Sequence, residues 1–179
     1  MRTIVFIALL TAAGCSSKLE PEYTGCGTDE NWVTFDDNEK FSTVDDTMAP
    51  LVTMPAAGAS VAVAALKLTW QQDPNDVGAP DGDVPHDANS CPQYTTGGLT
   101  TLHEPPISGN VYDLQFSVGG TLVHRLVTTL QEWAPDAADT GKLTGKTVSL
   151  KIYRMSVLRN DPKEGPFVGT APFTFSVTP

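Results

Sequence analysis

The sequence has little positive charge and few cysteines, and both shortages limit what the protein can be. Its 179 residues include 11 lysines and arginines against 21 aspartates and glutamates, which gives a formal net charge of −10. So acidic a chain repels phosphate backbones, and we therefore expect no nucleic acid among its partners. The three cysteines contain no Cys-x-x-Cys pair, so the usual thiol-redox, haem-attachment and zinc-ribbon motifs are absent.

Motifs of the common enzyme classes are missing as well. The chain has no Gly-x-Ser-x-Gly elbow, P-loop or dinucleotide-binding fingerprint. The histidines, His86, His103 and His124, show no metal-ligand spacing, and His124 is expected to pack or to face solvent from a strand. We expect no enzyme, no catalytic residues and no cofactor. A carboxylate-dependent hydrolase or an enzyme accessory domain stays an alternative, because paired carboxylates meet only in space.

Long hydrophobic runs are also absent, and the apolar run within residues 1–10 is too short to cross a bilayer. This run follows a positive start and precedes small residues, which is typical of a secretory signal. The segment Ala12-Ala13-Gly14-Cys15 resembles the lipobox of bacterial lipoproteins, with alanine in place of the usual leucine. The resemblance implies that residues 1–14 are removed, that Cys15 is lipidated and that the protein is anchored in the cell envelope. Ser16 then favours the outer membrane, and a plain signal peptide is the alternative.

The two remaining cysteines are Cys26 and Cys91. In an oxidising envelope they most simply pair with each other in a disulfide, and two free thiols are the alternative.

Composition divides the mature chain into three parts. Residues 15–49 are largely polar and predict a tether and N-terminal extension that lies over the folded body without a core of its own. Residues 50–179 predict one β domain. Within it, residues 71–110 are rich in Asp, Pro, Gly and Asn and form a long acidic loop insertion.

Alternating apolar and polar residues predict the strands of this domain. They cover residues 60–70, 111–118, 121–130, 147–157 and 172–178. Gly119-Gly120 predicts a two-residue hairpin turn, and a second turn is expected at residues 160–165. No window of useful length has helical periodicity. The pattern therefore favours an all-β fold, an antiparallel β-sandwich.

Three segments give this part of the chain its likeness to a known family. Residues 50–58 form a proline- and glycine-containing first strand, residues 66–70 end in Trp70, and residues 111–116 carry Tyr112. In this pattern the domain resembles bacterial fibronectin type III or immunoglobulin-like domains. The resemblance implies a buried Trp70 and a sandwich with the long insertion between its second and third strands. Such folds serve many roles and do not by themselves define a function.

The acidic insertion is the candidate metal site of the sequence. Closely spaced carboxylates supply the hard oxygen ligands that calcium requires. The candidate ligands are Asp73, Asp76, Asp81, Asp83 and Asp87. Residues 81–92 also resemble a degraded thrombospondin type 3 calcium repeat, and a solvated acidic loop is the alternative.

Aromatic residues outside the strands, Trp32 and Trp133 among them, are expected to cover the ends of the sandwich or to contact a partner. The sequence thus predicts a lipid-anchored envelope protein with a non-catalytic binding or structural sandwich. The acidic loop would face an unknown protein or glycan partner. A calcium-binding adhesion-type module that uses residues 73–91 is the alternative.

Overall fold

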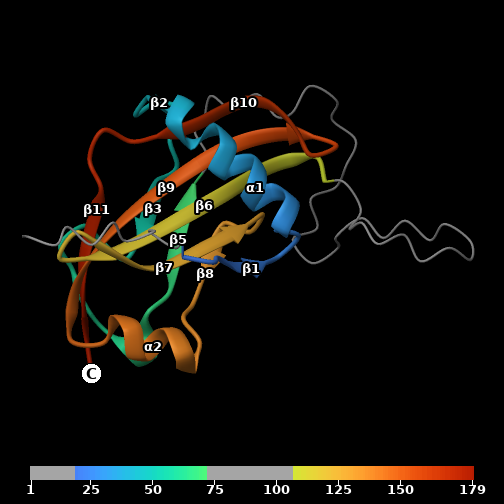
Figure 1. Ribbon diagram of the computed structural model, residues 1–179. Coiled ribbons are helices and arrows are strands. Elements are labelled where there is room, and N and C mark those ends of the chain that lie inside the picture. The colour runs from blue at the N-terminus through green and yellow to red at the C-terminus, as the bar shows by residue number, and fades with distance from the viewer. Residues whose placement is uncertain (1–18, 72–106) are drawn as a thin grey trace, which may run out of the picture.

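The computed structural model describes residues 19–71 and 107–179, of which 50% are in strands and 18% in helices (Figure 1). In chain order the elements are β1 (Glu22–Thr24), α1 (Asp29–Asn38), η1 (Glu39–Phe41), β2 (Thr43–Val44), β3 (Leu51–Met54), β4 (Ser60–Ala62), η2 (Val63–Ala65), β5 (Leu68–Gln71), β6 (Gly109–Val118), β7 (Thr121–Thr128), β8 (Glu132–Trp133), α2 (Ala137–Leu143), β9 (Lys146–Leu158), β10 (Asp161–Val168) and β11 (Phe173–Thr178). The fold is therefore β-rich, as expected, but it also contains helices.

The strands form an eight-stranded and a three-stranded sheet. In the large sheet β7, β6 and β9 are antiparallel neighbours, and β9 pairs along its two halves with β11 and β10. The short strands β1, β2 and β4 add to β7, β10 and β11 in parallel, so the prediction of a purely antiparallel fold is wrong at these pairs. In the small sheet β3, β5 and β8 are antiparallel.

The parallel pairs share one cause. Each of these short strands comes from the first 62 residues and joins a partner that follows it by about a hundred residues or more. A hairpin would force antiparallel pairing, whereas strands so far apart in the chain are free to pair in parallel. The alternation of apolar and polar residues within a segment does not indicate whether its strand pairs in parallel or antiparallel.

The long strands agree with the alternating pattern. In β6 the side chains of Tyr112, Leu114 and Phe116 are buried on the face toward the small sheet. Gly119 and Gly120 have φ of 58° and 83°, as the predicted two-residue turn between β6 and β7 requires.

Two segments differ from the prediction. Residues 60–70 are not one strand: β4 pairs with β11 in the large sheet, η2 follows, and β5 joins the small sheet. The second turn is at Arg159 and Asn160, with φ of 55° and 65°. Residues 161–168 after it form β10, whose prolines and charges hide it from a pattern search.

The main apolar cluster lies between the two sheets. Its fully buried members come from β5, β6, β7, β9 and β11 and from α2. The rings of Trp70 and Tyr112 meet edge to face, with centroids 5.6 Å apart at 74°. Trp133 is 5% exposed and its ring lies 4.9 Å from that of Phe116, so it belongs to this core instead of covering an end of the fold.

Helix α1 covers the other face of the large sheet (Figure 1). Thr28 caps it: the Thr28 hydroxyl accepts from the Asn31 amide, and the Asn31 side chain accepts from the Thr28 amide. Phe35 and the half-buried Trp32 pack against a second cluster with Val111, Val127 and Met155 among its members. Because α1 buries so few apolar side chains, its sequence shows no helical periodicity. The polar segment after Leu19 is thus folded onto the body from β1 onward.

Candidate functional site

In the described part of the chain, the buried His124 lies between the carboxylates of Glu22 and Asp139. His124 is in β7, and its side chain is 4% exposed. Its Nε2 lies 3.5 Å from Oε2 of Glu22 in β1, and its Nδ1 lies 3.2 Å from Oδ1 of Asp139 in α2. One ligand atom from each of these residues falls within 4.8 Å of the others. We call Glu22, His124 and Asp139 the triad cluster.

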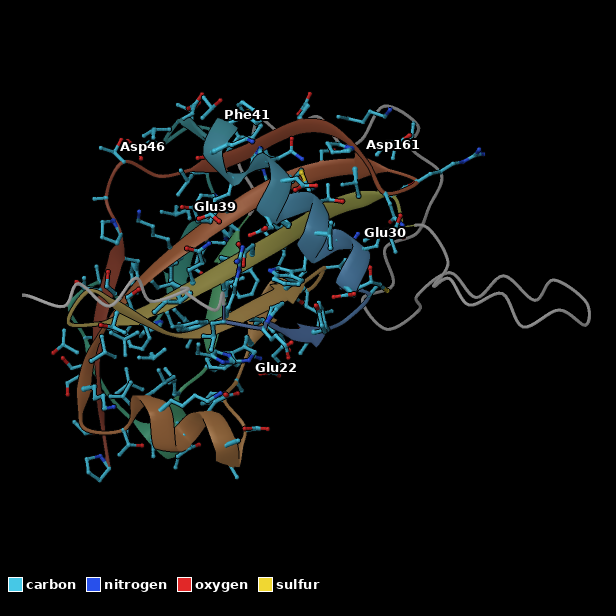
Figure 2. All side chains as sticks on the ribbon, in the orientation of Figure 1. Glu22, Glu30, Glu39, Phe41, Asp46 and Asp161 are labelled. Atoms are coloured by element: carbon cyan, nitrogen blue, oxygen red, sulfur yellow. The ribbon has the colours of Figure 1, made fainter. Side chains whose placement is uncertain are left out.

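Strand pairing and a helix cap place the two acids. Glu22 lies opposite Leu126 in the parallel β1–β7 pair, and side chains two positions apart on β7 share a face, so Glu22 can reach His124. Figure 2 shows Glu22 on the side of β1 toward α2. The Asp136 carboxylate caps α2 by accepting from the amides of Ala138 and Asp139. This cap sets Asp139 in the first turn.

Aromatic rings fix the imidazole. The His124 ring stacks on Trp133, with centroids 5.4 Å apart and 27° between the planes, and Phe116 lies 5.2 Å away. With its faces held by these rings, the imidazole directs its two nitrogens along the β1 and α2 sides.

Charges in the triad cluster are balanced by Lys142. Its Nζ donates to Oδ1 of Asp139 at 2.8 Å and lies 3.5 Å from Nδ1 of His124. Burial would raise the pKa of Asp139, but the hydrogen bond from Lys142 and the charge of His124 outweigh it and lower that pKa. Burial, followed by the hydrogen bond and charge of Asp139, raises the pKa of Glu22 to about 7. Burial lowers the pKa of His124 although Asp139 opposes the change.

In the described part of the chain, Nε2 of His124 has no hydrogen-bond partner, and Oδ2 of Asp139 has none unless a protonated Glu22 donates to that carboxylate. Leaving a polar group buried and unpaired costs about 1–3 kcal/mol. A proton shared between neighbours or a bound cation would satisfy these atoms.

A second polar centre lies under α1. Arg125 pairs with Asp113, and Glu39 lies beside them at the start of η1. An open hollow next to this pair is lined by Asp36, Asp37, Glu39, Lys40 and Tyr153. Gln115 donates to Glu39 and Arg125 pairs with it, so this centre fits the role of holding η1 and the end of α1 on the sheet.

Most sequence-predicted site residues lie outside the described residues. These are Cys15, Cys91, His86, His103 and the five aspartates Asp73, Asp76, Asp81, Asp83 and Asp87. Cys26 is half-buried against the second cluster, and its pairing with Cys91 stays a prediction. The sequence left open whether His124 packs in the fold or faces solvent, and its burial decides for packing; its carboxylate neighbours were not predicted.

Comparisons with protein-family models, with curated proteins and with solved structures gave no match for this chain. Among the described helices, none combines the length and apolar character needed to span a bilayer.

Proposed function

We propose that the protein is a lipid-anchored protein of a bacterial cell envelope, whose folded part is a non-catalytic binding or structural module. The lipobox ending in Cys15 supports the anchor. The pairing of the strands is the observation that supports a binding or structural module, because it fits a fibronectin type III or immunoglobulin-like sandwich.

The order of the central strands supports this assignment. In immunoglobulin sandwiches of the constant type one sheet holds the first, second, fourth and fifth strands, and the other holds the third, sixth and seventh. Here β3, β5 and β8 form the small sheet, while β6, β9 and β11 are neighbours in the large one. Strand β7 takes the place of the additional strand that variable-type domains carry beside the third. The edge-to-face contact of Trp70 and Tyr112 joins the two residues on which the resemblance depends.

The anchor in this proposal is short. Strand β1 begins at Glu22, so six residues, 16–21, separate it from Cys15. Six extended residues reach about 20 Å at most. A lipidated Cys15 would therefore hold the β1 edge of the body close to the headgroups, and a partner would be met near the membrane surface.

The partner surface in this proposal is the acidic segment predicted at residues 71–110, of which Gln71 ends β5 and residues 109–110 begin β6. It joins β5 to β6, the strands whose Trp70 and Tyr112 are buried in the main apolar cluster. A rigid scaffold that carries an exposed loop is a common arrangement for binding a protein or a glycan.

Metabolic labelling tests the anchor. Cells that express the full chain and are fed radiolabelled palmitate should incorporate label into it, and the protein should pellet with membranes. Cys15→Ser should abolish both, because no other residue offers the lipobox thiol. Cys26→Ser is the matched control and should keep the label. Label that persists in Cys15→Ser, or its absence from the unaltered chain, would overturn the proposal.

A further inference from the structure

We propose that Glu22, His124 and Asp139 bind a divalent transition-metal ion of the zinc class. This inference goes beyond the proposed function: it assigns a metal site in the folded body and does not depend on the lipid anchor or on the acidic loop.

Donor spacing supports a bound ion. Zinc binds imidazole nitrogen and carboxylate oxygen at about 2.0–2.2 Å, so neighbouring ligand atoms of a tetrahedral site lie about 3.3–3.6 Å apart. Nε2 of His124 lies 3.5 Å from Oε2 of Glu22, within this range. One donor atom from each of the three residues already lies within 4.8 Å of the others. Asp139 now contacts Nδ1 at 3.2 Å, and its carboxylate would turn toward the Nε2 side to complete the set.

An unpaired buried nitrogen supports it independently. Nε2 of His124 has no hydrogen-bond partner among the described residues. The His124 side chain is 4% exposed, so bulk water does not satisfy this nitrogen. A cation bound to Nε2 would remove the cost of leaving it unpaired. The stacked Trp133 ring holds the imidazole in place for it.

The donor chemistry selects the class of ion. One imidazole and two carboxylates suit zinc and its first-row neighbours, and a water molecule would complete four ligands. Calcium and magnesium prefer six or more oxygens and make little use of imidazole. The site is thus chemically distinct from the calcium site suggested for the acidic loop.

Lys142 competes with the metal. Its ammonium bonds to Oδ1 of Asp139 and supplies the positive charge that the two acids require in the absence of an ion. The Lys142 side chain is 43% exposed, so it can turn to solvent when a dication takes over this role. Removing the lysine charge should therefore strengthen metal binding.

Zinc titration of the full chain, purified without a histidine tag, tests the proposal. Calorimetry should show a high-affinity Zn²⁺ site, and Zn²⁺ should raise the melting temperature relative to EDTA. Glu22→Gln and His124→Gln should each weaken binding at least about tenfold, because losing even an outer-shell partner of a metal has effects of this size. Lys142→Gln should bind more tightly.

Matched variants separate this site from other zinc ligands and from loss of folding. Glu132→Gln changes an exposed acid that pairs with Lys67, and His86→Ala and His103→Ala remove the other histidines. All three should bind as the unaltered chain does. Glu22→Gln decides the matter if His124→Gln fails to fold, because the Glu22 side chain is 35% exposed and its loss leaves no core cavity.

Cobalt supplies the second readout. Co²⁺ in place of zinc should give the visible absorption of a four-coordinate ion, lost in Glu22→Gln. The proposal is overturned if the chain binds no Zn²⁺, or if binding survives in Glu22→Gln and disappears with His86 or His103. In that case the triad cluster is a metal-free ion network.

Discussion

Arg125 on β7 holds Asp113 on β6 through a two-pronged ion pair. Nε and Nη2 of Arg125 donate to Oδ1 and Oδ2 of Asp113 at 2.8 and 2.6 Å. Both side chains are nearly inaccessible, at 4% and 1% exposure. Gln115 adds a third hydrogen bond to Oδ2 at 3.0 Å, and Glu39 lies 3.6 Å from Nη2 of Arg125. The face of β6 that the alternating pattern marks as polar is thus buried under η1 and α1.

Breaking this pair should cost much stability. Asp113→Asn leaves the buried Arg125 guanidinium with only the partly exposed Glu39, 3.6 Å away, as a counter-charge. Losses of about 3–5 kcal/mol are usual when one partner of a buried ion pair is removed. Urea denaturation should show this loss in the free energy of unfolding. The double variant Asp113→Leu/Arg125→Met should recover most of it, because an apolar pair leaves no charge unpaired.

The exposed pair of Lys67 and Glu132 is the control for this measurement. Its atoms lie 2.7 Å apart, but the two side chains are 49% and 60% exposed. Lys67→Met should change stability by less than about 1 kcal/mol. Equal losses from the two pairs would contradict the role assigned to burial.

The pH dependence of stability should carry the signature of Glu22. Burial and the neighbouring Asp139 raise its pKa from 4.5 to about 7 in the folded protein. Between these two values the folded state binds more protons than the unfolded state, so the contribution of Glu22 is present below about pH 4.5 and is lost as pH rises through about 7. The stability of the unaltered chain relative to Glu22→Gln should therefore fall across this interval.

The effect of His124 on stability changes with pH in the opposite direction to that of Glu22. The contribution of Glu22 is therefore read from the difference in stability between the unaltered chain and Glu22→Gln. Its folded pKa is lowered by burial, so its contribution is lost as pH falls below 6.5. Burial, Asp139, Lys142 and Asp136 set that shift, and the Glu22→Gln variant retains them all. The free energy of unfolding of the unaltered chain and of Glu22→Gln should be measured by denaturation in EDTA at a series of pH values and at the same salt concentration. Parallel curves for the two proteins would show that Glu22 does not titrate in this range.

Trp133 should prove essential to the core. Trp133→Ala removes a ring that contacts Phe116 and His124, and deletions of this kind cost about 3–5 kcal/mol. Phe41→Ala, an aromatic that is 68% exposed, should stay within about 0.5 kcal/mol of the unaltered chain. Chemical denaturation of both variants checks the contrast. Similar losses at the two positions would place Trp133 outside the core.

The sequence was informative where one face of a strand is buried and the other is polar. Leu114 and Phe116 alternate with polar residues, so β6 could be located closely. The alternating pattern failed where pairing with a neighbouring strand determines the structure. Strand β10 has a polar composition and is held in place by its pairing with β9. Helix α1 likewise depends on its Thr28 cap and on a single fully buried ring, Phe35.

The triad cluster could not be predicted from spacing. Glu22 and His124 are about a hundred positions apart, and only the parallel pairing of β1 with β7 brings them together. Asp139 joins them because α2 returns to β7 after β8. Each residue alone has an ordinary setting in the sequence, and a lone histidine on a strand gives no sign of the carboxylates beside it.

The short strands β1, β2 and β4 have a consequence for solubility. They pair with edges of β7, β10 and β11. If left unpaired, the amides and carbonyls of these edges could bind a strand from another molecule. Strands of two or three residues are too brief to serve as templates for such growth. Strands β1 and β2 thus protect parts of the β7 and β10 edges from pairing with another molecule. A chain that begins at Ala49 would expose these two edges and is expected to aggregate.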